Sequence, residues 1–522
     1  MSDTRPVGFW SVAEADPERI AIVDADDSPT TFGELQRAAR ALGEGLRSLG
    51  LRRGDAVATV LPNVPTVFTV YLAAMESGLY LTPVNSHLAA PEVAHVIADS
   101  GARAVVVHGD LAETCRSGTD GAGIDAGRRF AEPEADGYRP LRELIELGAG
   151  RSDRPEAAGT GALMLYTSGT TGLPKGVRRP LPTGDPDPLL GARARVYCAG
   201  FGMPIGPATH LVCGPLYHAG PSASAFNALH AGSTVVLMGS WTPRRFLELV
   251  ERHQVASTQM VPTMFHRLLA LPEDERARYD VSSLTGVMHT GAPCPVHVKQ
   301  ALMDWLGPVV YETYGGTESV ATIATPRRWL DNPGTVGKPI HGVTVHILDE
   351  NGDELPPGEV GEIWIESAQA RSTEYFNDAT KTARMRRDDM VTLGDVGYLD
   401  ENGLLFLRDR VVDMIISGGV NIYPAEIESV LLACPLVGDA AVIGIPDEEW
   451  GEQVLAIVEP AAGVAADDDT ANALRGFCEQ RLARFKLPRR IDFVDALPRL
   501  PNGKIQKRTL RSPYWEGRGR VI

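Results

Sequence analysis

The sequence predicts an α/β protein of more than one domain, in which mostly parallel sheets are flanked by helices. Three observations support this class. The 522 residues are too many for a single hydrophobic core. From residue 8 to about residue 410, short apolar runs alternate with segments of helical spacing, which is typical of parallel α/β layers. After residue 343 the pattern becomes rich in strands.

The alternation is clearest in the middle of the chain, where apolar runs and helical spacing follow one another without interruption. Strands are expected at residues 234–238, 255–261, 286–290 and 309–312, and helices at 243–252, 263–270 and 298–306. Ligands of such sheets bind at the carboxyl ends of the strands. The segments that follow Thr290 and Glu312 are therefore candidates for a binding site.

Other parts of the chain carry weaker signals. Residues 116–160 show no clear period, and much of this segment is expected to be a surface excursion. Residues 181–195 look similar. Asn351-Gly352 joins two apolar segments as a hairpin turn would. Near the C-terminus, helices are expected at residues 424–432 and 471–483, and strands at 440–445 and 454–459.

The charge balance argues against nucleic acid as a partner. There are 50 Lys and Arg against 67 Asp and Glu, a net charge of −17, with no long basic cluster. Six scattered cysteines argue against disulfides or a zinc site. No signal peptide and no apolar run long enough for a transmembrane segment are evident. A cytoplasmic location is expected, while peripheral membrane contact and a homodimer stay open.

The stretch at residues 166–176, YTSGTTGLPKG, is the most informative one. Its hydroxyls, its glycine backbone and Lys175 suit a nucleotide triphosphate, because backbone N–H groups and a lysine can surround phosphate oxygens. An apolar run at residues 162–166, interpreted as a buried strand, precedes it. The spacing is not that of a Walker A loop. A flexible surface turn is the alternative explanation of this composition.

This loop resembles the signature loop of the adenylate-forming superfamily, which includes acyl-CoA synthetases, peptide-synthetase adenylation domains and firefly-type luciferases. Further motifs follow in family order: GPLYHAG at 214–220, TGAP at 290–293, YETYGGTES at 311–319, LGDVGYLDENGLLFLRDR at 393–410, SGGVN at 417–421 and PRLPNGKIQK at 498–507. The resemblance covers almost the whole chain. It implies a domain of stacked sheets with a β-rich subdomain at residues 1–410, and a small mobile α+β lid at residues 411–522.

The resemblance also assigns roles to individual residues. It implies that ATP and AMP are bound by Thr167, Ser168, Gly169, Thr170, Thr171, Gly172, Lys175, Gly291, Ala292, Pro293, Glu312, Thr313, Tyr314, Gly315, Thr317, Asp395 and Arg410. It implies an acyl pocket of Tyr217, His218, Thr290, Gly291, Gly315 and Gly316, and a CoA tunnel at Ser417, Gly418 and Gly419. Glu318 and Thr170 would hold Mg2+, since Mg2+ binds few protein oxygens together with phosphates. Catalysis would fall to Lys504, His218, Thr170 and Glu318.

Within these roles, Tyr314 would face adenine and Asp395 would accept hydrogen bonds from the ribose hydroxyls. Arg410 would donate to ribose or phosphate. Lys504 would bridge the substrate carboxylate and the α-phosphate as negative charge builds in the transition state. Each of these residues also has an ordinary structural explanation, such as a turn residue or a solvated charge.

Two departures from the family pattern stand out. The hinge position near residues 411–413 carries Val412, where Asp or Lys is usual, and Asp413 follows it. Arg178 and Arg179 replace the usual residues after the phosphate loop, and the sequence offers no physical explanation for them.

The resemblance implies a carboxylic acid–CoA ligase that uses ATP, Mg2+ and CoA. A medium- or long-chain fatty acid is the first choice, and a cyclic, aromatic or steroid-like acid the second. Residues 212–226 contain no acid to neutralise an amine, and no cationic residue is apparent for a second carboxylate. Three alternatives stay open: transfer to a carrier protein's phosphopantetheine, a luciferase-like oxidoreductase, and a nucleotide-binding protein without catalysis.

Overall fold

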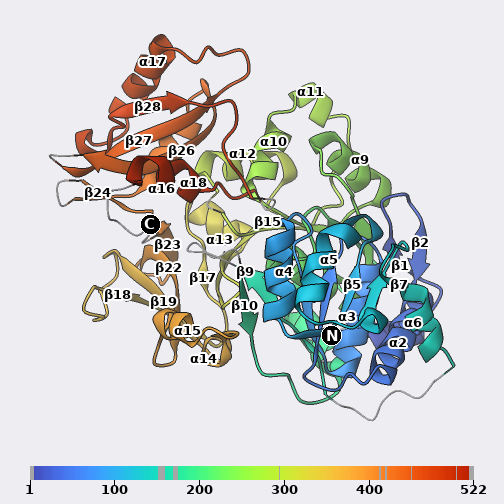
Figure 1. Cartoon of the computed structure of the whole chain (residues 1–522). Helices are drawn as coiled ribbons and strands as arrows, with labels where there is room; N and C mark the ends of the chain where they lie inside the picture. Colours follow the sequence, from blue (N-terminus) through green and yellow to red (C-terminus); the bar gives the residue numbers. More distant parts are fainter. Residues whose placement is uncertain are drawn as a thin grey trace.

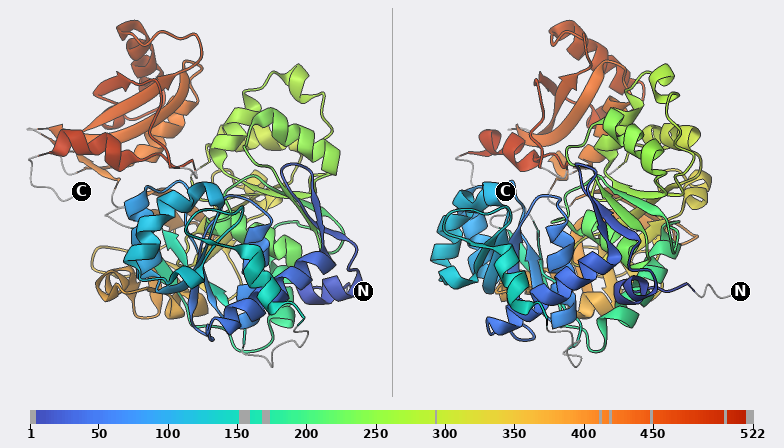
Figure 2. Two further views of the ribbon diagram at one scale, coloured as in Figure 1. Left: turned by 45° about the vertical axis from the view of Figure 1, so that its right-hand side comes forward. Right: turned by 90° about the vertical axis from the view of Figure 1, so that its right-hand side faces the viewer.

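The computed structural model of the chain describes residues 5–150, 159–167, 174–292, 294–410, 413–417, 420–447, 450–500 and 503–516. Two large sheets and their helices form most of the molecule, and a smaller sheet close to the C-terminus stands at the top in each view (Figures 1 and 2). Two small antiparallel sheets complete the fold.

The largest sheet has nine strands. Its central strands run parallel, and its two edges carry antiparallel strands. In spatial order they are β17 (Lys338–Pro339), β16 (Val320–Ala324), β15 (Val310–Gly315), β14 (Gly286–His289), β13 (Ser257–Met260), β11 (Thr209–Val212), β12 (Thr234–Leu237), β1 (Ile20–Val23) and β2 (Pro29–Thr31).

The second sheet has six strands, all parallel. Buried on both faces, such strands consist largely of apolar residues, and Ala56–Val60 is buried throughout. In spatial order the strands are β7 (Arg139–Pro140), β6 (Arg129–Ala131), β5 (Ala102–Val107), β3 (Ala56–Val60), β4 (Tyr80–Pro83) and β8 (Ala162–Leu163).

Helices fill and cover the space around these two sheets, giving five stacked layers (Figure 1). The middle layer holds α2 (Phe32–Ser48), α3 (Thr66–Ser77) and α8 (Ala219–His230). Against the far face of the six-stranded sheet lie α4 (Ala90–Asp99) and α5 (Ala112–Gly121). Against the far face of the nine-stranded sheet lie α9 (Pro243–His253), α10 (Pro262–Leu269) and α12 (Val296–Leu306).

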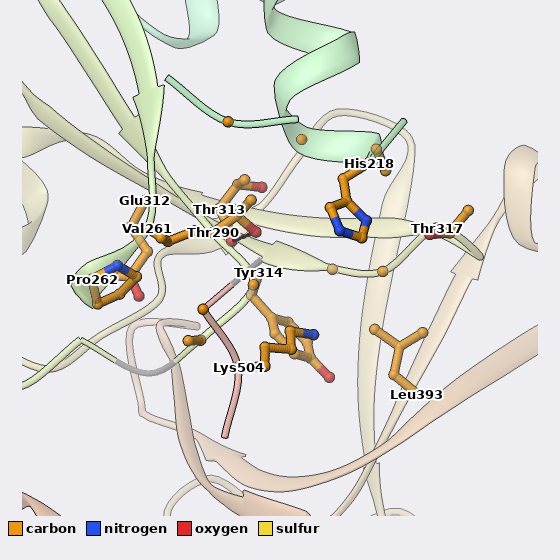
Figure 3. Close-up of a pocket in the computed structure, with 18 of the residues that line it drawn as sticks. His218, Val261, Pro262, Thr290, Glu312, Thr313, Tyr314, Thr317, Leu393 and Lys504 are labelled. Carbon is orange, nitrogen blue, oxygen red and sulfur yellow. Dashed lines mark hydrogen bonds between the residues drawn. The ribbon is translucent and has the colours of Figure 1, made fainter. Parts of the chain in front are cut away.

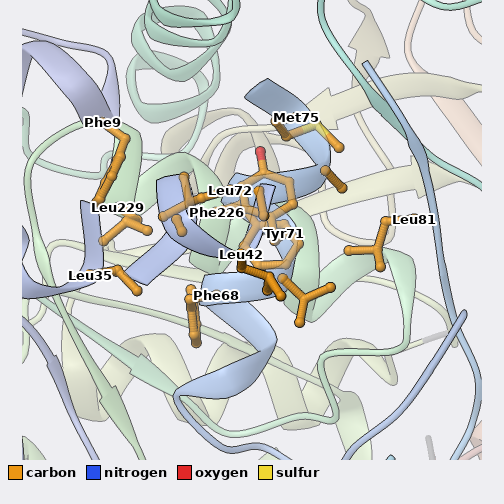
Figure 4. Close-up of a cluster of buried hydrophobic side chains, with 14 of the residues drawn as sticks. Phe9, Leu35, Leu42, Phe68, Tyr71, Leu72, Met75, Leu81, Phe226 and Leu229 are labelled. Atoms are coloured by element: carbon orange, nitrogen blue, oxygen red, sulfur yellow. The ribbon is translucent and has the colours of Figure 1, made fainter. Parts of the chain in front are cut away.

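The core of the middle layer is aromatic (Figure 4). Tyr71 on α3 stacks on Phe226 of α8 with ring centroids 3.7 Å apart, and Phe68 meets the same ring edge-on at 5.6 Å. Such pairs stabilise packing beyond the area they bury. They fix α3 against α8, and the open side of this pair borders the cleft described below.

The remaining sheets are smaller. A three-stranded sheet contains β20 (Glu374–Tyr375), β10 (Lys175–Arg178) and β9 (Leu165–Thr167). A five-stranded sheet contains β18 (Val343–Leu348), β19 (Gly361–Ser367), β22 (Met390–Leu399), β21 (Arg386–Arg387) and β23 (Leu405–Arg410). The C-terminal sheet contains β25 (Val420–Ile422), β24 (Ile415–Ser417), β27 (Gly451–Pro460), β26 (Val437–Asp447) and β28 (Arg490–Phe493).

Further helices complete the chain. Those of the large part are α1 (Phe9–Ala15), α6 (Leu141–Gly148), α7 (Pro186–Gly200), α11 (Glu273–Arg276), α13 (Pro326–Asp331), α14 (Ala368–Ser372) and α15 (Ala379–Met385). Those of the C-terminal part are α16 (Pro424–Leu432), α17 (Asp468–Glu479) and α18 (Lys507–Trp515). None of the described helices has the length and apolar character that crossing a bilayer requires.

The α/β class with large parallel sheets, a β-rich subdomain and a C-terminal domain is confirmed, but three local expectations are wrong. Residues 116–150 contain parts of two sheet-packed helices and two strands. Residues 181–195 contain the start of α7, whose N-cap Asp185 and following Pro186 are ordinary helix signals. Residues 162–167 form two short strands in different sheets, because Met164 separates them.

Two glycines on α5 allow a test of this packing. A Cβ at Gly118 would lie 2.8 Å from the Cα of Ala94 on α4, whereas Gly121 has no atom within 4 Å of its Cβ position. Gly118→Ala should lower the free energy of unfolding by about 1–3 kcal/mol through overpacking. Gly121→Ala should leave it unchanged or raise it by up to about 1 kcal/mol, through helix propensity. Equal effects in urea unfolding would contradict the packing of α4 on α5.

Candidate active site

A cleft of about 2900 Å³ lies at the carboxyl ends of β13, β14 and β15 and extends to residues of the C-terminal domain. Figure 3 shows part of its lining, with His218, Thr290, Tyr314 and Lys504 drawn around one space. Ends of parallel strands are where ligands bind in such folds. Segments that are hundreds of residues apart in the sequence thus meet at one place.

The loop after β14 is tied to β15. The hydroxyl of Thr290 donates to the carbonyl oxygen of Thr313 at 2.9 Å, and the hydroxyl of Thr313 donates to the carbonyl oxygen of Thr322. Gly291 has a φ of 87°, which a residue with a side chain rarely adopts. The backbone of this loop therefore borders the cleft in a fixed position.

Tyr314 and Asp395 meet although they come from different sheets. The Tyr314 hydroxyl donates to Oδ2 of Asp395 at 2.9 Å. The Cα of Asp395 on β22 lies opposite that of Arg410 on β23 in the antiparallel ladder. An aromatic face and a carboxylate set side by side suit a planar base with an attached sugar, as the sequence predicts for these two residues.

The stems of the phosphate loop form an antiparallel hairpin in which Thr167 pairs with Lys175. The Lys175 ammonium lies 5.1 Å from the ring centroid of Tyr375, and burial, followed by the charge of Lys381, lowers the pKa of Lys175. The Tyr375 hydroxyl donates to Oε1 of Glu318 at 2.7 Å. Lys175 and Glu318, from distant motifs, thus share a neighbour.

Arg179 explains one of the departures noted above. Its guanidinium donates to the carbonyl oxygens of Thr317 and of Glu318, the latter at 2.9 Å, and to the hydroxyl of Thr373 at 2.8 Å. Arg178 lies 4.4 Å from the centroids of both the Tyr80 and Phe376 rings. Arg179 therefore positions the segment that carries Glu318. Arg178 stabilises β10 through its cation–π contacts.

Lys504 reaches the cleft from the C-terminal domain. Its Cε lies 3.8 Å from the position that a Cβ on Gly291 would occupy. The adjoining Gly503 has a φ of 84° and approaches Thr263, whose Oγ1 would be 2.8 Å from a Cβ there. A side chain at residue 503 would crowd Thr263, and at both glycines the positive φ would strain a residue with a side chain. The turn thus places an ammonium group against the loop after β14.

His218 lies at the N-terminus of α8, beside the same space (Figure 3). Burial, followed by the charge of Lys504, lowers the pKa of His218 to about 4, so the imidazole is neutral at physiological pH. Within the described part of the chain, its Nε2 and the hydroxyl of Tyr217 have no hydrogen-bond partner. Both atoms are buried, so a ligand reaches them only after neighbouring groups shift.

Glu312 has a structural partner. Lys299 Nζ donates to its Oε2 at 2.7 Å, and both side chains are buried. Burial alone would raise the pKa of Glu312, but the neighbouring His289 and Lys299 lower it to about 2. This ion pair stabilises the end of β15, and a contact of Glu312 with nucleotide stays a prediction.

Some expected site residues lie outside the described residues. These are Ser168, Gly169, Thr170, Thr171, Gly172, Pro293, Val412, Gly418 and Gly419, together with the side chain of Arg410. Asp413, next to the expected hinge, accepts from Arg511 of α18 at 2.6 Å. Ser417 ends β24 and pairs with Gly451 of β27.

The metal expectation rests on Glu318. Among the described residues, no group of three or more His, Cys, Asp or Glu could by itself hold a metal ion. Mg2+ does not need such a group, because it is commonly bound by one or two carboxylates and by substrate phosphates. Glu318 is 8% exposed and its Oε1 already accepts from Tyr375, which orients the carboxylate and suits this mode of binding.

Sequence reasoning missed Arg179 as a support and Tyr375 as the link between Lys175 and Glu318. Both act through contacts between segments about 60 to 140 residues apart. A charged residue directly after the phosphate loop was the available signal for Arg179. No local pattern marks Tyr375.

Comparisons with known proteins find relatives along almost the whole chain. The family model of the AMP-binding enzyme matches residues 9–373, and that of the AMP-binding enzyme C-terminal domain matches residues 426–504. The chain is 32% identical to the fatty acid–[acyl-carrier-protein] ligase ScoC of Streptomyces coeruleorubidus, over 98% of this chain and 96% of that protein. It is 34% identical to the 2-succinylbenzoate–CoA ligase of Geobacillus kaustophilus, over 95% of each. The structure of the amide bond synthetase McbA from Marinactinospora thermotolerans superposes with a TM-score of 0.82 at 28% identity, covering 95% of this chain and 97% of that one.

Arg179→Met tests the support of the Thr317–Glu318 segment. Loss of charge-assisted hydrogen bonds worth about 1.5–3 kcal/mol should weaken AMP binding about tenfold or more. Arg178→Met is the control, because it removes a neighbouring charge that does not contact this segment, and its affinity should match that of the unaltered protein. Calorimetric titration with AMP measures both. Equal affinity in the two variants would show that Arg179 does not support the site.

Proposed function

Because the chain belongs to the AMP-binding enzyme family and is an AMP-forming acid–thiol ligase, we propose that it joins a carboxylic acid to CoA in two steps. The acid carboxylate attacks the α-phosphorus of ATP, the bond between the α-phosphorus and the bridging oxygen breaks, and pyrophosphate leaves. The sulfur of CoA then attacks the carbonyl carbon of the acyl-adenylate, and AMP leaves with the bonding electron pair.

The approach of Lys504 to Gly291 carries this proposal. An ammonium group between the acid carboxylate and the α-phosphate stabilises negative charge as it develops in the transition state. Tyr314 and Asp395 would hold the adenosine, with Asp395 accepting from the ribose. Glu318, oriented by Tyr375, would hold Mg2+, which supplies charge neutralisation to the phosphate oxygens.

His218 marks the boundary between nucleotide and acyl group. As a neutral ring it can border an uncharged acyl chain without a large desolvation cost. Beyond it, Phe226, Met288 and Ile323 line the cleft with apolar surface. This lining favours an apolar acyl body, aliphatic or cyclic.

For the second step we propose a rearrangement of residues 411–522 that withdraws Lys504 and lets the thiol reach the acyl-adenylate. We place the hinge at residues 411–413. Ser417, Gly418 and Gly419 would then line the path of the pantetheine arm. Such rotation both completes the site and excludes water.

The direct test is release of AMP and pyrophosphate from ATP, Mg2+ and a panel of aliphatic and aromatic acids. When CoA is added, the enzyme should complete many catalytic cycles and release acyl-CoA. Phosphopantetheinylated carrier protein is the competing acceptor, in view of the likeness to ScoC. If AMP forms and only the carrier protein yields a thioester, the acceptor is the carrier protein and not CoA. If no acid supports AMP formation, the function is wrong.

Lys504→Ala separates the two steps. Removal of the ammonium should reduce adenylate formation, measured by acid-dependent exchange of pyrophosphate into ATP, by a factor of about 100 to 1000. Thioester formation from added acyl-adenylate should change little. Lys486→Ala is the control, because Lys486 pairs with Glu426 within the C-terminal domain. Loss of both steps in the Lys504 variant would contradict the assigned role.

A further inference from the structure

One face of α7 borders the acyl end of the cleft. Leu189, Arg193 and Val196 follow one another at helical spacing and all line the cavity. Leu189 and Val196 are exposed to 39% and 77%, so protein atoms do not cover their apolar side chains. The sequence did not mark a cation for a second carboxylate, and Arg193 stands between these two residues.

Arg193 is exposed and has no hydrogen-bond or ion-pair partner within the described part of the chain. Its charge acts on Tyr71, Tyr197, His230 and Arg179, and none of these is an anion at neutral pH. Arg179 and Arg511, by contrast, each donate to an oxygen acceptor of the protein. The guanidinium of Arg193 is therefore left to water, and a carboxylate in the cavity could accept from it in a bidentate manner.

A second donor points to the same ligand. The backbone N–H of Phe9 donates to Nδ1 of His230, and burial lowers the pKa of His230 to about 3. The neutral ring must then carry its hydrogen on Nε2, which lies 3.1 Å from the hydroxyl oxygen of Tyr71 and donates to it. The hydrogen of the Tyr71 hydroxyl is thereby left to donate elsewhere.

Tyr71 is 4% exposed and lines the cleft, and its hydroxyl hydrogen has no acceptor among the described residues. Burial raises its pKa, so it remains protonated and a donor. Figure 4 shows Tyr71 against Phe226, with Met75 on the same helix. A buried hydroxyl donor and a guanidinium, both without acceptors, share one cavity with apolar walls.

We infer that Arg193 and Tyr71 bind an anionic group at the far end of the acid, so that the substrates are apolar acids with a second, distal carboxylate. This inference rests on the proposed function and narrows its substrate class. The likeness to a 2-succinylbenzoate–CoA ligase, whose named substrate carries two carboxyl groups, is compatible with it, whereas the likeness to a fatty acid ligase is not specific for it.

The test compares acids of equal chain length with and without the distal carboxylate, such as suberic acid with octanoic acid. With saturating ATP, kcat/KM for AMP formation by the unaltered enzyme should favour the diacid at least about tenfold. Arg193→Met should lower kcat/KM for the diacid by a factor of about ten to a hundred and leave kcat/KM for the monoacid unchanged. Arg193→Lys should keep part of the preference for the diacid, and Tyr71→Phe should lose a smaller part of this preference than Arg193→Met does.

Arg195→Met is the matched control. Arg195 lies on the same helix but donates to the carbonyl oxygen of Arg5, so its removal should leave the ratio of the two acids unchanged. Because Arg193 has no protein partner, its variants should unfold at the temperature of the unaltered enzyme. Calorimetric titration with suberic acid in the presence of a non-hydrolysable ATP analogue gives a readout that does not depend on turnover.

Two results would overturn the inference while leaving the proposed function intact. One is an unaltered enzyme that activates octanoic but not suberic acid. The other is an Arg193→Met variant whose kcat/KM falls equally for both acids while its KM for ATP rises. That result would mean that Arg193 binds a phosphate group of ATP. Failure of every acid to yield AMP would instead remove the proposed function, and this inference with it.

Discussion

The contact between Lys504 and the loop after β14 is the constraint on which the site depends. Lys504 comes from the C-terminal domain, and its Cε lies 3.8 Å from the Cβ position of Gly291. Only glycine at residues 291 and 503 permits this approach without strain or crowding. With it, the cleft acquires a cation next to His218, and the two domains enclose one space. Without it, the N-terminal domain could still bind a nucleotide but would lack a charge at the reacting carboxylate.

The charges of the cleft follow one pattern. Three of its carboxylates already accept hydrogen bonds from protein donors: Glu312 from Lys299, Glu318 from Tyr375, and Asp395 from Tyr314. Lys175, Arg193 and Lys504 line the same cleft with positive charge. An acidic protein with a net charge of −17 thus presents cations where the anionic ligands must lie. In the proposed complex, Lys175 would meet the triphosphate, Lys504 the reacting carboxylate and Arg193 the distal anion.

Much of this could be predicted from the sequence, because motifs with glycine, hydroxyl and lysine at fixed spacing are local. Helical spacing located α9, α12 and α16, the last with the bounds 424–432 that the structure shows. What escaped was non-local. The α7 segment was mistaken for a surface excursion because Pro188 and Gly191 interrupt its helical spacing, although Asp185 and Pro186 are ordinary signals of a helix start. Arg193 was missed with it, because its proposed role depends on Tyr71 and His230, which come from distant segments of the sequence.

The most direct measurement is a crystal structure with a non-hydrolysable acyl-sulfamoyl adenosine that carries a terminal carboxylate. The account predicts adenine at Tyr314, ribose hydroxyls on Asp395, the sulfamoyl group beside Lys504 and Gly291, and the terminal carboxylate at Arg193. Adenosine bound away from β15, or a sulfamoyl group out of reach of Lys504 in the same domain arrangement, would contradict it.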